Sequence, residues 1–125
     1  MAQRSHCELD LLKRFLPTPY FFDVDSDGET VHIESNDLEI ALMLRSRQFA
    51  QPSSCVQHWT IMRDYKAGVA EDGVTLIVDN DLRTLLAGRE TILIFDRRLR
   101  KVLGFVGWID VEYVASVLIP LLIAT

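Results

Sequence analysis

Apolar and polar residues alternate over two short stretches near the start of the chain, and an acidic turn separates them. Phe21 to Val24 and Thr30 to Glu34 have the period-two pattern of strands, and Asp25-Ser26-Asp27-Gly28 lies between them. An Asp-Gly step between such runs is a strong hairpin signal, because glycine tolerates positive φ at little cost. The pattern therefore predicts an antiparallel hairpin.

Three other segments have helical periodicity. Apolar residues at helical spacing predict a short helix over 8–16, which Pro17 and Pro19 end. Asn36 is the expected N-cap of a second helix, with Glu39 completing a capping box and a wide apolar stripe suited to packing on a sheet. Asp110 is the expected N-cap of a closing helix over 111–124, in which Pro120 predicts a kink.

Five more strands are expected over 56–64, 74–78, 83–87, 91–95 and 102–106. The run 74–78 is apolar throughout, which is typical of a strand buried on both faces or central in a sheet. Residues 83–87 also fit one helical turn, but the strand is favoured. The chain is therefore expected to be an α+β domain, with a mainly antiparallel sheet of about five to seven strands, two or three helices packed on it, and Trp59 and Trp108 largely buried.

Length and composition favour one ordinary globular domain over 1–125, with residues 1–7 frayed. Apolar residues make up 49% and charged residues 25% of the chain, and the net charge of −5 argues against a nucleic-acid-binding face. Cys7 and Cys55 form no disulfide framework, and no signal peptide is recognisable, so a reducing cytoplasm is the expected location. The apolar run at 114–124 is too short for a membrane span, which needs about 20 residues.

The acidic turn also has the spacing of a calcium-binding loop. Asp23, Asp25, Asp27, Gly28 and Glu34 fit the pattern D-x-[DN]-x-[DN]-G-x5-E. Two observations argue against it: Pro17 and Pro19 lie where an entering helix would end, and Thr30 occupies a position that is usually aliphatic. A hairpin that holds no metal is favoured, and a calcium-binding domain remains the alternative.

No set of residues forms a recognisable catalytic constellation. His6, His32 and His58 are scattered along the chain, and each is interpreted as a strand-face or surface histidine. Cys55 precedes His58 by three residues, but no third group is available to orient that pair. The chain is therefore expected to be non-enzymatic and to need no cofactor.

One concentrated group of positive charges lies in the turn between the strands at 91–95 and 102–106. Arg97, Arg98, Arg100 and Lys101 could together receive an acidic peptide or a phosphate. A solvated hairpin tip is the favoured interpretation, and the anion-binding patch is the alternative.

The closing helix is apolar on more than one face. Val111, Val114, Ala115, Leu118 and Leu122 are spaced to pack on the domain's own sheet. This leaves a second apolar face of Val117, Leu121 and Ala124, with Ile119 and Ile123 between the two faces. Exposed contiguous apolar surface is rare in monomers. The pattern therefore predicts a twofold homodimer through this helix, and an interaction or regulatory module that acts through protein contacts.

The order of these features resembles the leader region of bacterial HPr kinase-like proteins. The similarity lies in an aromatic-rich strand, a turn, the strand Val31-x-Ile33-Glu34-Ser35, a capped Leu-rich helix, and the later Ile92-x-x-Phe95-Asp96-Arg97-Arg98. In that family this region precedes a P-loop kinase domain. The present chain has no G-x-x-x-x-G-K-[ST] motif, so none of the family's catalytic residues carries over.

Overall fold

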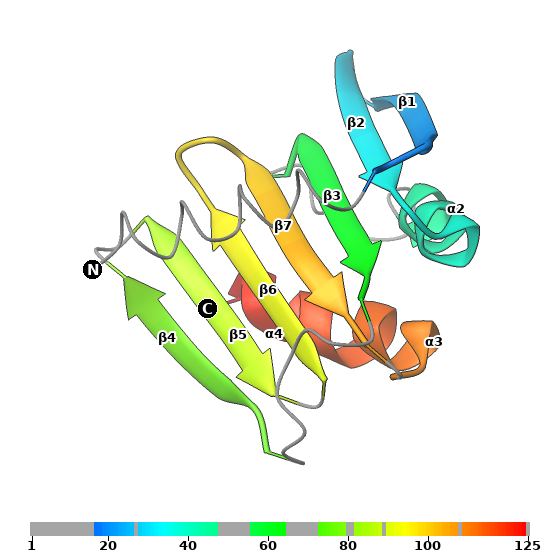
Figure 1. Ribbon diagram of the computed structural model, residues 1–125. Coiled ribbons are helices and arrows are strands. Elements are labelled where there is room, and N and C mark those ends of the chain that lie inside the picture. The colour runs from blue at the N-terminus through cyan, green and yellow to red at the C-terminus, as the bar shows by residue number, and fades with distance from the viewer. Residues whose placement is uncertain are drawn as a thin grey trace.

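The computed structural model describes residues 17–26, 28–47, 56–64, 73–79, 82–88, 90–107 and 109–124. The expected helix over 8–16 lies outside these residues, as do His6, Cys7, Cys55, Asp27 and Trp108. The described part of the chain forms two layers, with one sheet in front and the helices behind it (Figure 1).

Seven strands form a single mixed sheet in the order β1-β2-β3-β7-β6-β5-β4. The strands are β1 (Tyr20–Ser26), β2 (Glu29–Ser35), β3 (His58–Arg63), β4 (Thr75–Asp79), β5 (Arg83–Gly88), β6 (Thr91–Asp96) and β7 (Lys101–Val106). Four of the six pairings are antiparallel, while β3 runs parallel to both β2 and β7. The predicted α+β class and mainly antiparallel sheet are confirmed, as are the first hairpin and the strand at 83–88.

Two helical segments cover one face of the sheet. Helix α2 (Leu38–Arg47) connects β2 to β3, and the closing segment consists of α3 (Val111–Tyr113), the π-helical η1 (Val114–Leu118) and α4 (Ile119–Ala124). The inward residues predicted for the closing helix are all buried, namely Val111, Val114, Ala115, Leu118 and Leu122. They join one core with side chains of α2 and the sheet, including the buried Trp59, whose burial the sequence predicted.

The N-cap of α2 differs by one residue from the prediction. Asp37, not Asn36, receives the backbone N–H groups of Glu39 and Ile40 on its Oδ1, at 2.9 and 3.4 Å. Asn36 instead pairs with the backbone of Arg63: its Nδ2 donates to the Arg63 carbonyl at 2.8 Å, and its Oδ1 accepts from the Arg63 N–H at 2.7 Å. The cap at Asp110 is as predicted, because its Oδ1 accepts from the Glu112 N–H at 3.0 Å.

Pro120 is accommodated by a change of helix type one turn before it. A proline at this position offers no N–H to the preceding turn, and its ring crowds the carbonyl four residues back. Residues Val114 to Leu118 form a π-helical turn, and the Ile119 N–H bonds to the carbonyl of Val114, five residues earlier. Such single π turns occur within α-helices, where they widen the helix locally.

The prediction that residues 74–78 form a central or doubly buried strand is wrong. Strand β4 pairs with β5 alone among the described strands, and it forms an edge of the sheet. Ile77 and Val78 are 49% and 50% exposed. A continuous apolar run indicates that burial of the side chains is favourable, but it does not specify how many neighbouring strands the strand pairs with.

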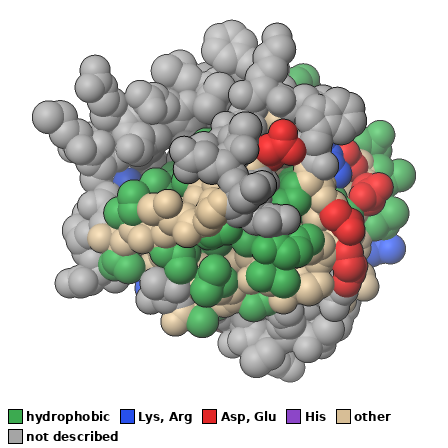
Figure 2. All heavy atoms as spheres, turned by 90° about the horizontal axis from the view of Figure 1, so that it is seen from below, with side chains coloured by type: hydrophobic (Ala, Val, Ile, Leu, Met, Phe, Trp, Pro, Cys, Tyr) green, Lys and Arg blue, Asp and Glu red, His purple; other side chains and the backbone are tan. Residues whose placement is uncertain are grey.

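Apolar side chains also reach the outer surface of the helical layer. Leu38 and Leu42 of α2 are exposed, and so are Val117 and Leu121 of the closing helix. Figure 2 shows the molecule from below the view of Figure 1, not from the helical side, with hydrophobic side chains across the middle and acidic side chains toward one margin.

Arg63, at the carboxyl end of β3, connects three segments. Its Nε donates to Asp37 Oδ2 at 3.2 Å, and its Nη1 donates to the carbonyls of Gly107 and Ile109 at 2.6 and 3.1 Å. Its side chain is only 13% exposed. Because these three acceptors belong to the start of α2 and to the link between β7 and α3, one guanidinium connects both helical segments to β3.

We expect Arg63→Ala to lower the free energy of unfolding by about 2–4 kcal/mol, because it leaves the Asp37 carboxylate and two carbonyls without this donor. Urea denaturation followed by circular dichroism measures the change. Arg98→Ala removes an exposed arginine and is the control, with an expected change within about 0.5 kcal/mol. A loss below about 1 kcal/mol for Arg63→Ala would show that the network is dispensable.

Candidate functional site

Ionisable side chains form a row across the sheet face opposite the helices, and the row continues beyond Lys101 to Asp96 of β6 and Arg83 of β5. Asp23 pairs with His32 across β1 and β2, His32 with His58 across β2 and β3, and His58 with Lys101 across β3 and β7. Their neighbours along the strands, among them Val31, Trp59 and Val102, point into the core shared with the helices. Because successive side chains alternate between faces, the row lies on the other face.

His32 is held in place from two directions. Its Nδ1 lies 2.7 Å from Asp23 Oδ1. Its ring stacks on that of His58, with centroids 4.8 Å apart and planes inclined by 17°. With Nδ1 engaged by the carboxylate, Nε2 is the nitrogen of His32 that remains to meet another group. The ring of Phe21 lies on a further side, 6.4 Å from His32 between centroids.

A second row of side chains lies two residues further along the strands, on the same face of the sheet. Phe21 pairs with Glu34 across β1 and β2, and Glu34 pairs with Thr60 across β2 and β3. The Thr60 hydroxyl donates to Glu34 Oε1 at 3.3 Å. Thr60 is 3% exposed, so this contact places the Glu34 carboxylate over β3.

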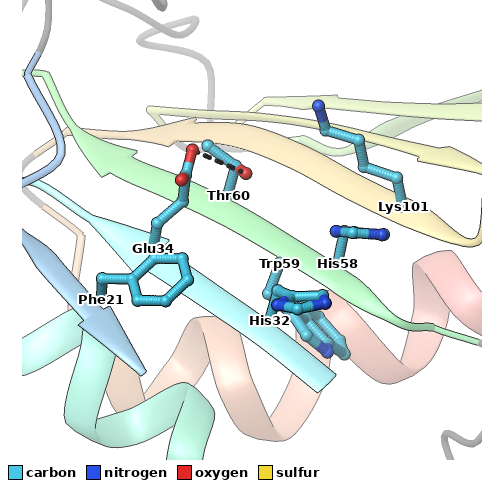
Figure 3. Close-up of a pocket in the computed structure, with 7 residues that line it drawn as sticks. All are labelled: Phe21, His32, Glu34, His58, Trp59, Thr60 and Lys101. Carbon is cyan, nitrogen blue, oxygen red and sulfur yellow. Dashed lines mark hydrogen bonds between the residues drawn. The ribbon is translucent and has the colours of Figure 1, made fainter. Parts of the chain in front are cut away.

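The two rows enclose a cavity of about 260 Å³. It is lined by Phe21, His32, Glu34, His58, Trp59, Thr60 and Lys101. Figure 3 shows Glu34 and Thr60 together on one side, with His58 and Lys101 on the other and His32 below them. The volume is below the roughly 300–1,000 Å³ of drug-sized sites, so only a small ligand fits.

The lining groups are suited to binding by charge and hydrogen bonds. They supply one carboxylate, one ammonium, two imidazoles and a hydroxyl, and no lining residue is a serine or cysteine. Within the described residues, no group of three or more His, Cys, Asp or Glu side chains is placed to hold a metal. Single-sequence reasoning missed this site, although the regular spacing of His32 and Glu34 along one strand face was a usable signal.

The carboxylates of the acidic turn have partners within the hairpin. Asp23 contacts His32, while Asp25 Oδ1 accepts from the Thr30 hydroxyl at 3.2 Å. Glu34 contacts Thr60 on the next strand. The hairpin register therefore determines where these three carboxylates lie, and Asp27 is outside the described residues.

The basic turn does not present one patch. Arg97 donates from Nη1 to Thr84 Oγ1 at 2.8 Å, and its guanidinium carbon lies 4.8 Å from the Phe95 ring centroid. Arg100 makes two hydrogen bonds to the Glu29 carboxylate, at 3.2 and 2.8 Å. Lys101 lines the cavity, and Arg98 is exposed. The four charges thus have four different surroundings.

The residues proposed for the dimer interface divide into two groups. Val117 and Leu121 are 43% and 40% exposed, and Ala124 is also exposed. Ile119 is 4% exposed and belongs to the chain's own core, while the half-buried Ile123 packs against that core. Of these five residues, Val117, Leu121 and Ala124 therefore lie on the outer face of the closing helix.

Comparison of the chain with protein-family models, curated proteins and solved structures finds no match. The resemblance to the HPr kinase-like leader region therefore stays a prediction. None of the helices among the described residues has the length and apolarity needed to cross a bilayer. Function must accordingly be inferred from the side chains of this chain alone.

We expect the hairpin to bind no calcium at physiological concentration, because Asp23, Asp25 and Glu34 are separated by the ladder and have other partners. A calcium site requires six to eight oxygen ligands at about 2.3–2.6 Å. Isothermal titration with calcium tests this. Saturable one-to-one binding at micromolar affinity, abolished by Asp25→Ala, would contradict the expectation.

A second expectation concerns the Glu29–Arg100 pair. The hydrogen bonds and charge of Arg100 lower the pKa of Glu29 below its ordinary value of 4.5. The stabilisation from this pair is present above that ordinary pKa and is lost as the pH falls through the lowered one. In Arg100→Gln the pKa of Glu29 should rise, as measured by NMR titration of its carboxyl carbon. Arg98→Gln should leave it unchanged, and equal Glu29 titration in the wild type and Arg100→Gln would contradict the pairing.

Proposed function

We propose that this chain is a non-enzymatic interaction module that self-associates as a twofold dimer through its closing helix. The observation that carries the proposal is the exposure of Val117 and Leu121, at 43% and 40%, on a helix whose opposite face is fully packed. The two residues are one helical turn apart, so they lie on the same side of the helix.

The neighbouring helix extends this apolar surface. Helix α2 contacts both α3 and η1, and its Leu38 and Leu42 are 45% and 39% exposed. These residues are again one turn apart. The outer side of the helical layer thus offers aliphatic side chains from two adjacent helices, which is the composition of a hydrophobic interface core.

The charge distribution on the closing segment agrees with burial against a partner. Glu112 is its one charged residue, in the first turn, and every residue from Val114 to Ala124 except Ser116 is apolar. The Ser116 hydroxyl donates to the carbonyl of Glu112, so even this polar group is satisfied within the helix. Covering apolar surface at about 25 cal/mol per Å² favours association, and a symmetric pair of identical faces is the commonest solution.

The activity proposed is recognition, with regulation through protein contacts. A cytoplasmic location remains part of this proposal. The net charge of −5 supports a protein partner over nucleic acid, because a nucleic-acid-binding face is normally basic.

We expect the purified chain at tens of micromolar to have twice its 14.3 kDa mass by light scattering on a size-exclusion column. Leu121→Asp should convert it to a folded monomer, because a carboxylate buried at the dimer axis would be desolvated without a partner charge. Leu99→Asp is the matched control: Leu99 is 53% exposed but lies in the turn before β7, so this variant should remain dimeric. A wild-type monomer, or a Leu121→Asp dimer, would contradict the proposal.

A further inference from the structure

Strand β4 forms the edge of the sheet farthest from β1 (Figure 1). Its antiparallel pairing with β5 uses the backbone groups on one side of the strand, and alternate residues direct their N–H and C=O groups to the other side. Among the strands that the structure describes, β5 is its one neighbour. An edge of this kind is a template for one further strand.

The side chains of β4 are apolar on both faces of the sheet. Leu76 stands opposite Leu86 of the core, so Leu76 and Val78 lie on the helical face and Ile77 lies on the other face. Ile77 and Val78 are 49% and 50% exposed. Edge strands are commonly protected by lysine, proline or a bulge, but β4 contains neither residue and its register with β5 is continuous. This edge is therefore suited to pairing.

The sequence of β4 is complementary to a second copy of itself. Where an antiparallel strand extends a sheet, side chains that stand opposite each other point to the same face. A twofold axis at Ile77 meets this condition for all five residues: Ile77 faces its own copy, and Leu76 faces Val78. Asp79, the one charged residue of the strand, falls opposite Thr75. No like charges meet in this register.

The opposite edge of the sheet lacks this complementarity. The same operation on β1 places a twofold axis at Asp23, the middle residue of the strand, so that Asp23 stands opposite its own copy. Like charges directly opposite each other destabilise a strand pair. Charge complementarity therefore favours β4 over β1 as the edge that pairs with itself.

We propose that β4 is a second self-association surface, on which β4 of another copy adds as an antiparallel strand and makes the two sheets continuous. The inference does not rest on the proposed function, because β4 contains no residue of the closing helix. The contact uses five residues of each chain, against about 20–30 in a standard interface, so its dissociation constant should be on the order of hundreds of micromolar. Helix-linked dimers should therefore join further only in concentrated solution.

The test is sedimentation equilibrium of Leu121→Asp, from tens of micromolar to the millimolar range, with folding checked by circular dichroism. Its mass should rise with concentration toward that of two chains. Adding Ile77→Lys should abolish this rise, because the two introduced charges would stand directly opposite each other. Phe21→Lys is the matched control: Phe21 is 54% exposed on the other edge strand, and this variant should associate as its parent does. Absence of the rise, or a rise unaffected by Ile77→Lys or abolished by Phe21→Lys, would overturn the proposal.

A mixing experiment separates pairing from any effect on folding. In the Leu121→Asp chain, Ile77→Lys and Ile77→Glu should each prevent association alone, and an equimolar mixture should restore it, because opposite charges then face each other across the twofold axis. A mixture that stays monomeric would contradict the register. The mass at low concentration reports on the closing helix, whereas the effect of residue 77 reports on β4, so failure of one interface is distinguishable from failure of the other.

Discussion

The contacts of Arg63 join three segments that are far apart along the chain: the start of α2, the strand β3, and the link between β7 and the closing helix. Strand β3 is parallel to β2 and to β7, so the carboxyl ends of all three strands point in the same direction. Helix α2 begins just after β2 and the closing helix begins just after β7, which brings the starts of both helical segments to these carboxyl ends. The Arg63 guanidinium lies there and bonds to Asp37, Gly107 and Ile109. The parallel arrangement therefore places the Arg63 side chain where it can bond to both helical segments.

The same arrangement explains where the cavity lies. In open sheets with parallel strands, ligands commonly bind beyond the carboxyl ends of the strands. Here the region at the carboxyl ends is occupied by Arg63, Asn36 and Asp37, whose side chains form hydrogen bonds with each other and with the backbone. His58 and Lys101 instead stand at the amino ends of β3 and β7, on the face away from the helices. The cavity therefore lies over the first residues of β3 and β7 and the last residues of β2.

The outer face of the closing helix and the cavity lie on opposite sides of the sheet. The closing helix presents Val117 and Leu121 outward from the helical layer, while the cavity opens on the other face of the sheet. Core residues of the sheet, such as Ile61 and Phe95, separate the two surfaces. A dimer formed through the outer face of the closing helix therefore does not use the side chains that line the cavity.

Local patterns determined much of this structure. Asp-Gly between alternating runs specified the first hairpin, and the spacing of Val114, Leu118 and Leu122 specified the inward face of the closing helix, because both depend on residues close in sequence. The tertiary structure alone decided the rest. Asn36 lost the cap to Asp37 because the backbone of Arg63 offered it two hydrogen bonds. His32, His58 and Lys101 became neighbours only through the parallel pairing of β2, β3 and β7, and strand order is set by the packing of the whole core, which no local pattern encodes.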